Sequence, residues 1–176
     1  MKKVLLHICC GICSSWAIEK LKIDGFQVCG FFYNPNIQPE EEYFKRLAVA
    51  QKVAEFHRIE LLAGKYDPDK WQQEVKGREN DPEGGKRCLV CFHFRLKETF
   101  RKAVELGIEH FTTTLTISPH KNFEVIKNIG SSLSPEGFLA YNFKKEDGFK
   151  KSNKFCREHE LYRQNYCGCL YSRISL

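Results

Sequence analysis

Short apolar runs alternate with stretches of helical spacing along most of the chain. The apolar runs are bounded by Gly, Pro and Asn, which is typical of buried strands. These runs predict strands at residues 4–8, 27–33, 59–62 and 111–116. Apolar residues spaced three and four apart predict helices at residues 14–23, 40–56, 67–75, 91–106, 118–129 and 155–162.

Capping signals indicate where several of these helices begin and end. Acidic residues fill the first turn of the helix at 40–56, where the helix dipole favours negative charge. Ser118 and Pro119 are typical of the N-cap and the first helical position, so we expect a helix to begin there. Gly107 ends the helix at 91–106.

Strand–helix–strand alternation predicts an α/β fold, a mostly parallel sheet with helices on both faces. The length of 176 residues predicts a single domain over residues 1–176, with a basic, loop-rich C-terminal part from about residue 135. Ligands of such sheets bind at the carboxyl ends of the strands. Cys9 and Cys10 end the first predicted strand and residues 118–121 follow the fourth. The expected site and the unusual residues therefore coincide.

Composition and charge add a preference for anionic partners. The chain is 42% apolar and 28% charged, which is ordinary for a globular protein. Its net charge of +6 favours polyanions such as nucleic acid, and its 13% aromatic content supplies rings on which bases can stack. No stretch approaches the roughly 20 apolar residues of a membrane span, so we expect no membrane partner.

The compartment decides what nine cysteines mean. In a small secreted protein they indicate a disulfide framework, and in a cytosolic protein they indicate metal or redox chemistry. Lys2 and Lys3 before an apolar run superficially resemble a signal peptide. However, the run is short, His7 interrupts it, and no small-residue cleavage site follows. We therefore expect a buried first strand and a cytoplasmic protein.

Two cysteine pairs have spacings typical of metal ligands. Cys88 and Cys91 form a C-x-x-C motif at a predicted helix start, where the helix N-terminus lowers thiol pKa values. The adjacent Cys9 and Cys10 have poor geometry for a disulfide, but at a strand-to-loop corner both can face a bulky cluster. Four thiolates are the usual ligands of a [4Fe–4S] centre. A structural zinc site and buried thiols without metal are the alternatives.

The other cysteines divide by their surroundings. Cys167 and Cys169 flank one glycine and can close a small strained disulfide, which would act as a labile redox couple. The alternative is that they are further metal ligands or inert thiols. Cys13 is either another ligand or a thiol at a helix start. Cys29 lies in an apolar strand and is expected to pack, and Cys156 has no partner at an informative spacing.

Taken together, five strings resemble the QueH family, the cobalamin-independent class of epoxyqueuosine reductases. They span nearly the whole chain in the order typical of the family, and several are long enough to be specific. The strings are residues 6–15 (LHICCGICSS), 32–37 (FYNPNI), 87–92 (RCLVCF), 111–121 (FTTTLTISPHK) and 162–169 (YRQNYCGC).

The resemblance implies a cytoplasmic enzyme that reduces epoxyqueuosine to queuosine at the wobble position of tRNA. It implies a Rossmann-like fold of the adenine-nucleotide-hydrolase type, with the metal site at the carboxyl ends of the strands. The implied site consists of a [4Fe–4S] cluster on Cys9, Cys10, Cys88 and Cys91 and a redox-active pair at Cys167 and Cys169.

The resemblance also implies a second metal ion beside the cluster, held partly by an Asp side chain. Asp67 is the candidate because it follows the third predicted strand. Its alternative role is to cap the short helix that follows. Cys13 is the other candidate ligand.

Reduction of an epoxide to an alkene takes up two electrons and two protons and releases water. No amino-acid side chain supplies electrons at the required potential, so a cofactor must. The expected partners are the anticodon loop of tRNA, where bases can be splayed out, and an electron donor that the sequence does not identify. His120 and Lys121 are candidate substrate contacts, and Tyr33, Tyr166 or His120 could donate a proton.

Other functional classes have to be weighed against this one. A structural zinc protein that binds RNA would share the cysteines and the charge but would lack redox activity. A thiol or heterodisulfide-type reductase would share the string that begins at Cys9, but its usual spacing differs from the long gap before Cys88. A nucleotide-dependent enzyme would need a glycine-rich phosphate loop after the first strand. Here that loop is rich in cysteine, so we do not expect ATP use.

Overall fold

The computed structural model describes residues 2–173 and contains one four-stranded sheet. All strand pairs are parallel, and the strand order is β3-β2-β1-β4. The register places Leu6 of β1 beside Gly30 of β2 and Thr112 of β4. The strands are β1 Lys2–His7, β2 Phe26–Phe32, β3 Glu60–Ala63 and β4 His110–Thr113.

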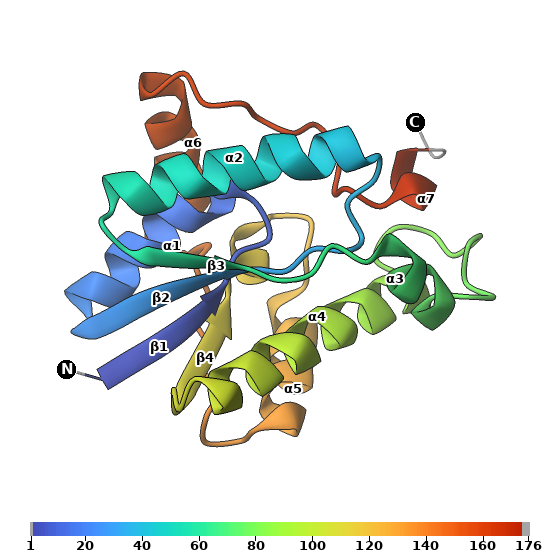
Figure 1. The fold of residues 1–176 in the computed structure, drawn as a ribbon, viewed down its shortest axis with the longest axis horizontal. Helices are drawn as coiled ribbons and strands as arrows, with labels where there is room; N and C mark the ends of the chain where they lie inside the picture. Colours follow the sequence, from blue (N-terminus) through green and yellow to red (C-terminus); the bar gives the residue numbers. More distant parts are fainter. Residues whose placement is uncertain (1, 174–176) are drawn as a thin grey trace.

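Helices cover both faces of this sheet (Figure 1). Helices α1, α2 and α6 lie on one face, and α3, α4 and α5 lie on the other. This arrangement confirms the predicted α/β fold class. The helices are α1 Gly11–Ile23, α2 Glu40–Phe56, α3 Pro68–Glu74, α4 Lys86–Glu105, α5 Phe123–Leu133, α6 Gly148–Glu158 and α7 Leu170–Arg173, with 3-10 turns η1 Thr114–Ile117 and η2 Lys145–Asp147. Within residues 2–173, none of them is long and apolar enough to cross a membrane.

Strand β1 is buried on both faces, which explains its nearly continuous apolar sequence. Successive side chains of a strand point to opposite faces. Leu6 and Ile8 therefore pack in the core under α1 and α2. Leu5 packs in the second core, with Phe111 of β4 and the apolar face of α4. The carboxyl end of β1 thus opens between the two helical layers.

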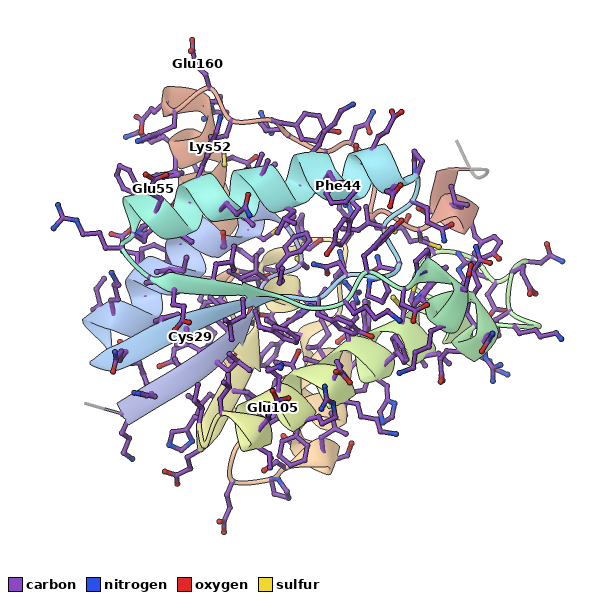
Figure 2. All side chains as sticks on the ribbon, in the orientation of Figure 1. Cys29, Phe44, Lys52, Glu55, Glu105 and Glu160 are labelled. Atoms are coloured by element: carbon purple, nitrogen blue, oxygen red, sulfur yellow. The ribbon has the colours of Figure 1, made fainter. Side chains whose placement is uncertain are left out.

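Helix α2 has the bounds that the sequence predicts. Its buried residues include Tyr43, Ala50 and Val53, which recur at helical spacing. Phe44 and Lys52 lie on the outer face, away from the sheet (Figure 2).

Helix α1 begins at Gly11, three residues before the predicted start at Ser14. Cys10 is the N-cap residue in extended conformation. At Gly11 a Cβ atom would lie 2.8 Å from the carbonyl carbon of Val49 in α2. The glycine therefore permits close packing of the two helices, and Cys10 to Cys13 form the first turn rather than a loop.

The predicted helix at Ser118 and Pro119 is wrong in its start. The fourth strand ends at Thr113 and continues as η1, and α5 begins only at Phe123. The hydroxyl of Ser118 accepts a hydrogen bond from the backbone N–H of His120 at 3.3 Å, which closes a turn instead of opening a helix. Asn122 is the N-cap of α5, and its side chain accepts from Val125 N at 3.3 Å.

Helices α4 and α6, like α1, begin earlier than their sequence patterns indicate. Helix α4 begins at Lys86 rather than Cys91, so both Cys88 and Cys91 belong to its first two turns. Helix α6 covers Gly148–Glu158 rather than 155–162. Ser152 and Cys156 are fully buried on α6, and this buried face holds the helix against α1.

Candidate metal centre and active site

A cavity of about 710 Å³ lies where the carboxyl ends of β1 and β4 meet the N-terminal ends of α1 and α4. Segments far apart in sequence contribute to its wall. Its lining includes His120 and Lys121, so these predicted contacts lie beside the cysteines. Seven of the nine cysteines line it, namely Cys9, Cys10, Cys13, Cys88, Cys91, Cys167 and Cys169.

Three of these cysteines form a tight group at the start of α1. The sulfurs of Cys9, Cys10 and Cys13 all lie within 4.8 Å of one another. The Cys9 and Cys10 sulfurs are 3.9 Å apart, and those of Cys10 and Cys13 are 2.7 Å apart. Such a set of thiols can hold a metal. Cys13, whose role the sequence leaves open, is therefore part of this group.

Cys9 is fixed to the end of β4 by Thr114. The Thr114 hydroxyl accepts from the backbone N–H of Cys9 at 3.0 Å and donates to its sulfur at 3.2 Å. Two residues before Cys9, His7 Nε2 donates a hydrogen bond to the carbonyl of Tyr33 at 3.1 Å. The other ring nitrogen, Nδ1, therefore accepts from the Thr113 hydroxyl at 2.8 Å. Burial lowers the pKa of His7 to about 4, so this imidazole is neutral at pH 7.

The three sulfurs differ in their acidity. Hydrogen bonds from the Cys10 and Cys13 thiols lower the pKa of Cys9, and the Lys121 ammonium group adds to this effect. Burial raises the pKa of Cys10 to about 12. The hydrogen bonds with Cys10 and Cys9, followed by burial, raise the pKa of Cys13. Cys9 is therefore the thiolate of the group.

Cys88 and Cys91 reach the cavity from the N-terminus of α4, on the opposite face of the sheet from α1. Cys88 Sγ accepts a hydrogen bond from the backbone N–H of Gly84 at 3.2 Å. Burial raises the pKa of Cys88. The positive end of the helix dipole faces both sulfurs and would stabilise them as thiolates when a metal replaces their protons.

The segment that carries Cys167 and Cys169 is held by Arg46 of α2. The Arg46 guanidinium is 2% exposed and donates to the carbonyls of Cys167 and Tyr166 at 3.1 and 3.0 Å. Its Nε donates to Glu42 Oε1 at 2.6 Å. Sequence reasoning missed Arg46, because nothing in the local pattern of α2 indicates a partner 121 residues away.

The turn between these two cysteines requires glycine. Gly168 has φ of +110°, a region that other residues rarely adopt. A Cβ atom at this position would also lie 2.8 Å from the Ile37 side chain and 3.1 Å from Arg46 Nη1. The glycine therefore allows Cys167 and Cys169 to turn in close against the cavity wall.

Cys167 and Cys169 have opposite pKa shifts. The hydrogen bond from Cys169 and the Ser172 hydroxyl at 3.1 Å lower the pKa of Cys167 to about 5. The hydrogen bond with Cys167 and burial raise the pKa of Cys169. At neutral pH the pair is a thiolate beside a thiol, which is the state that reacts in thiol–disulfide exchange.

Two further buried arginines line the cavity: Arg87, which opens the string at residues 87–92 singled out in the sequence, and Arg95, which sequence reasoning missed. Arg87 Nη1 donates to the carbonyls of Arg78 and Glu79 at 3.1 and 2.8 Å. Arg95 donates to Asn34 Oδ1 at 3.3 Å. Within residues 2–173, neither guanidinium forms an ion pair with a carboxylate. Because buried charges are normally compensated, these two cations favour an anionic group in the cavity.

Two buried polar atoms in the cavity wall support the same conclusion. Trp71 and Asn36 line the cavity and are 0% and 2% exposed. Trp71 Nε1 and Asn36 Oδ1 have no hydrogen-bond partner among the described residues. Buried polar groups are nearly always paired. A ligand in the cavity would supply the missing partners.

Asp67 lies outside the cavity lining and has other partners. It is the N-cap of α3, where its side chain accepts from Lys70 N at 3.2 Å. Lys65 Nζ lies 3.2 Å from the other carboxylate oxygen. The backbone hydrogen bond from Lys70, followed by Lys65, lowers the pKa of Asp67. The geometry thus favours the capping role over that of a second metal ligand.

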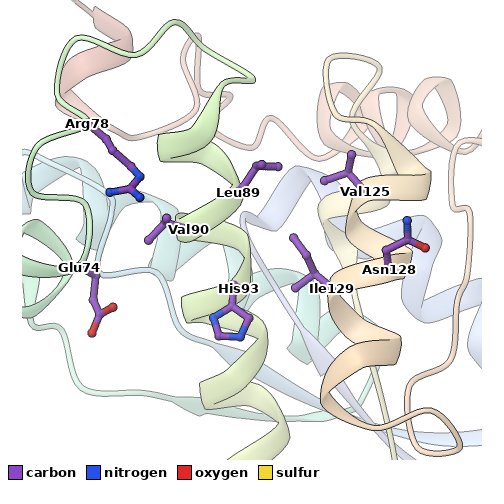
Figure 3. A pocket seen from close by; sticks show the side chains of 8 residues that line it. All are labelled: Glu74, Arg78, Leu89, Val90, His93, Val125, Asn128 and Ile129. Carbon is purple, nitrogen blue, oxygen red and sulfur yellow. The ribbon is translucent and has the colours of Figure 1, made fainter.

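A second hollow of about 630 Å³ lies between α4 and α5 (Figure 3). Leu89 and Val125 line both hollows, so the two adjoin. The apolar side chains of Leu89, Val90, Val125 and Ile129 gather between the helices, and no cysteine lines this hollow. The metal-binding chemistry therefore lies in the first cavity.

Comparison with known proteins decides the family. Residues 4–175 match the family model described as epoxyqueuosine reductase QueH. The chain belongs to the QueH family. It is 40% identical to the epoxyqueuosine reductase QueH of Streptococcus pyogenes serotype M1 over 178 residues, covering 96% of this chain and 69% of that protein. The proteins of the same name from Acinetobacter baylyi and Thermotoga maritima are 40% and 38% identical, covering 97% and 99% of this chain and 80% and 92% of their own.

This membership confirms the resemblance seen in the sequence. As a QueH epoxyqueuosine reductase, the protein is an oxidoreductase of queuosine biosynthesis. Its Cys9, Cys10 and Cys13 group can hold a metal.

Proposed function

We propose that this enzyme reduces epoxyqueuosine to queuosine at the wobble position of tRNA, using a [4Fe–4S] cluster held by Cys9, Cys10, Cys88 and Cys91. The observation that carries the proposal is a cavity lined by seven cysteines and by two buried arginines, Arg87 and Arg95, that have no carboxylate partner within residues 2–173. The family name supplies the reaction, and the cavity has the donors that such a reaction requires. Because tRNA is the substrate, the proposed compartment is the cytoplasm.

The donor set is better suited to a cluster than to a single zinc ion. Four thiolates on one zinc lie about 2.3 Å from the metal and hence about 3.8 Å from one another. Among the described residues, Cys9, Cys10 and Cys13 are the one group of three or more thiols, imidazoles or carboxylates whose ligand atoms all lie within 4.8 Å of each other. Cys88 and Cys91 approach from α4, across the cavity. A polynuclear cluster, whose ligands bind different iron atoms, can span that separation.

The surrounding charges would stabilise the cluster and its thiolate ligands. Arg87, Arg95 and Lys121 line the cavity, and the N-termini of α1 and α4 point into it. These positive groups offset the negative charge of thiolate-bound iron and sulfide. Such a cluster would deliver electrons to the epoxide, a transfer for which protein side chains alone have no suitable group.

The reaction is balanced by two electrons and two protons. The epoxide loses its oxygen as water, and the two ring carbons become an alkene. Oxidation of the Cys167 and Cys169 thiols to a disulfide releases two electrons and two protons, which matches this requirement. We propose that the pair passes electrons to the cluster and is reduced again by an external donor. Arg46 holds the carbonyl of Cys167, so the pair stays at the cavity wall during this exchange.

His120 and Lys121 are the proposed contacts to the substrate. Lys121 is half-buried at the cavity wall, and its charge lowers the pKa values of Cys9 and Cys167. Its ammonium group would pair with a phosphate of the anticodon loop. His120 is exposed beside it and can contact the same phosphate or donate a proton.

The test is anaerobic preparation followed by nucleoside analysis. Protein with a complete cluster should be brown and hold roughly four iron and four sulfide per chain. With an electron source it should convert epoxyqueuosine in RNA to a product lighter by one oxygen atom, without cobalamin or ATP. Unchanged nucleoside with an intact, reduced cluster would reject the reaction. Colourless protein with stoichiometric zinc would favour a structural zinc protein that binds RNA.

Single cysteine variants separate the proposed roles. Cys88→Ser should lose most of the visible absorption, whereas Cys29→Ser should keep it, because Cys29 lies on β2 and does not line the cavity. Cys167→Ser should keep the cluster and complete at most one turnover. Loss of the cluster in Cys167→Ser would instead make Cys167 a ligand. Full multiple turnover with a physiological donor in this variant would remove the redox role.

A further inference from the structure

The rim of the cysteine cavity carries an exposed aromatic ring. Phe149 lies in the first turn of α6, is 41% exposed, and is one of the residues that line the cavity. An exposed aromatic ring at the mouth of a site offers a flat surface on which a planar ligand group can stack.

The N-terminal turn of α6 is held firmly, so the position of Phe149 is defined. At Gly148 a Cβ atom would lie 2.6 Å from Trp16 Nε1, so only glycine lets α6 approach α1 this closely. Ser152 Oγ accepts from the backbone N–H of Trp16 at 3.2 Å. Asn153 Nδ2 donates to the carbonyl of Phe149 at 2.7 Å. The ring is thus presented from a rigid element, which packs against Trp16, three residues along α1 from Cys13.

Several cationic side chains line the same cavity as this ring or lie close to it in sequence, while Glu146 and Asp147 precede it. His120 and Lys121 line the same cavity, and Lys144 Nζ donates to the Lys121 carbonyl at 2.7 Å. Lys150 follows Phe149 in α6 and is exposed. Among the described residues that line the cavity, Glu83 is the one carboxylate, against Arg46, Arg87, Arg95 and Lys121. An exposed ring on a cavity whose charged lining residues are mostly cations favours a partner that is both aromatic and anionic.

We propose that Phe149 is the stacking platform for an unpaired nucleobase of the substrate RNA, the one adjacent to the modified nucleotide. This inference rests on the proposed function and goes further by locating a subsite at the rim of the reaction cavity. Single-stranded loops are recognised by stacking of splayed bases on aromatic rings. When one nucleotide enters the cavity, its neighbour stays at the rim, where Phe149 lies. Lys121 and Lys150 then contact the connecting phosphates.

Binding of an anticodon stem-loop measures the platform directly. Stacking on an aromatic ring contributes enough that Phe149→Ala should weaken binding by about 5- to 150-fold. With epoxyqueuosine in the loop, the loss should fall on KM rather than kcat. Phe149→Tyr should retain most of the affinity, because a phenol ring also stacks. Phe44→Ala is the matched control: Phe44 is 54% exposed on the outer face of α2 and does not line the cavity (Figure 2).

A second arm identifies the partner base. Stem-loops that lack the base on either side of the modified position are compared in wild type and Phe149→Ala. If the base stacks on Phe149, its removal weakens binding to wild type but has little further effect on the variant. Equal affinity of wild type and Phe149→Ala, or equal losses on base removal in both proteins, would overturn the platform. Wild-type conversion of the intact stem-loop is measured alongside. A failure there counts against the reaction, while the binding comparison still decides the platform.

Discussion

Single residues set the reactivity of each sulfur in the cavity. Thr114 donates to Cys9, Ser172 contacts Cys167, and the backbone of Gly84 donates to Cys88. Hydrogen bonds to a sulfur stabilise its thiolate, and burial opposes it. The outcome therefore differs between cysteines that are neighbours in sequence: the pKa of Cys167 is lowered and that of Cys169 is raised.

The first prediction at this scale concerns the alkylation of Cys167. Its pKa of about 5 means that it is a thiolate above pH 5 and a thiol below, so its reaction with iodoacetamide should fall as the pH drops through about 5. Ser172→Ala removes one stabilising contact and should move this midpoint upward. Mass spectrometry of the peptide that contains Cys167 measures the rate at each pH.

Cys29 is the internal reference for this experiment. Burial raises its pKa to about 11, so it should react slowly over the whole neutral range. If Cys167 has a midpoint near the ordinary thiol pKa of about 8.5, its activation by Cys169 and Ser172 is wrong.

At the scale of elements, α2 fixes the C-terminal segment through one buried ion pair. Arg46 and Glu42 are 2% and 7% exposed, and Glu42 also accepts from the Tyr162 hydroxyl at 2.7 Å. Glu42 therefore joins α2 to Tyr162, and Arg46 joins it to Tyr166 and Cys167, so the pair holds both ends of residues 162–167. Glu42 and Arg46 are four residues apart in α2, a spacing that places their side chains together on one face of the helix. The contacts with residues 162–167 come only from the tertiary structure.

The second prediction is that Arg46→Met lowers the free energy of unfolding by about 3–5 kcal/mol, because it leaves the Glu42 carboxylate buried without its cation. Urea unfolding measures this loss. The double variant Glu42→Gln, Arg46→Met should lose less, since no unpaired charge is left. A double variant that is no more stable than Arg46→Met would show that the lost carbonyl contacts, not the charge, dominate.

At the scale of the whole molecule, the parallel sheet decides where the site forms. The carboxyl ends of β1 and β4 bring Cys9 and Thr114 together, although 105 residues separate them. Helices α1 and α4 approach this edge from opposite faces, so a group bound by both would join the two helical layers (Figure 1).

The third prediction is that loading the metal group stabilises the entire fold. A group that binds the native state and not the unfolded chain raises stability by mass action. Each kcal/mol gained should raise Tm by about 2–4 °C in a chain of this size. Amide hydrogen exchange should slow at residues 9–13 and 84–91 together. Cys88→Ser should abolish the gain at both segments, and protection confined to residues 9–13 would contradict a shared group.

The sequence by itself determined the elements and the chemistry class. The spacing of apolar residues in 40–56 gives the bounds of α2, and the alternation of runs gives the parallel sheet, because both patterns are local and periodic. The C-x-x-C motif at Cys88 and the strings shared with QueH proteins gave the family. The helix start predicted at Ser118 is wrong, because a Ser hydroxyl can accept a backbone hydrogen bond in a turn as well as at a helix N-cap, and here it does so in a turn.

Only the tertiary structure decided how the site is assembled. Arg46 reaching Cys167, Thr114 holding Cys9 and Phe149 at the cavity rim are meetings of residues remote in sequence. No periodic pattern encodes such contacts, since they depend on how the sheet and helices pack around a common edge. The sequence thus specified which residues can do the chemistry, and packing specified which of them meet.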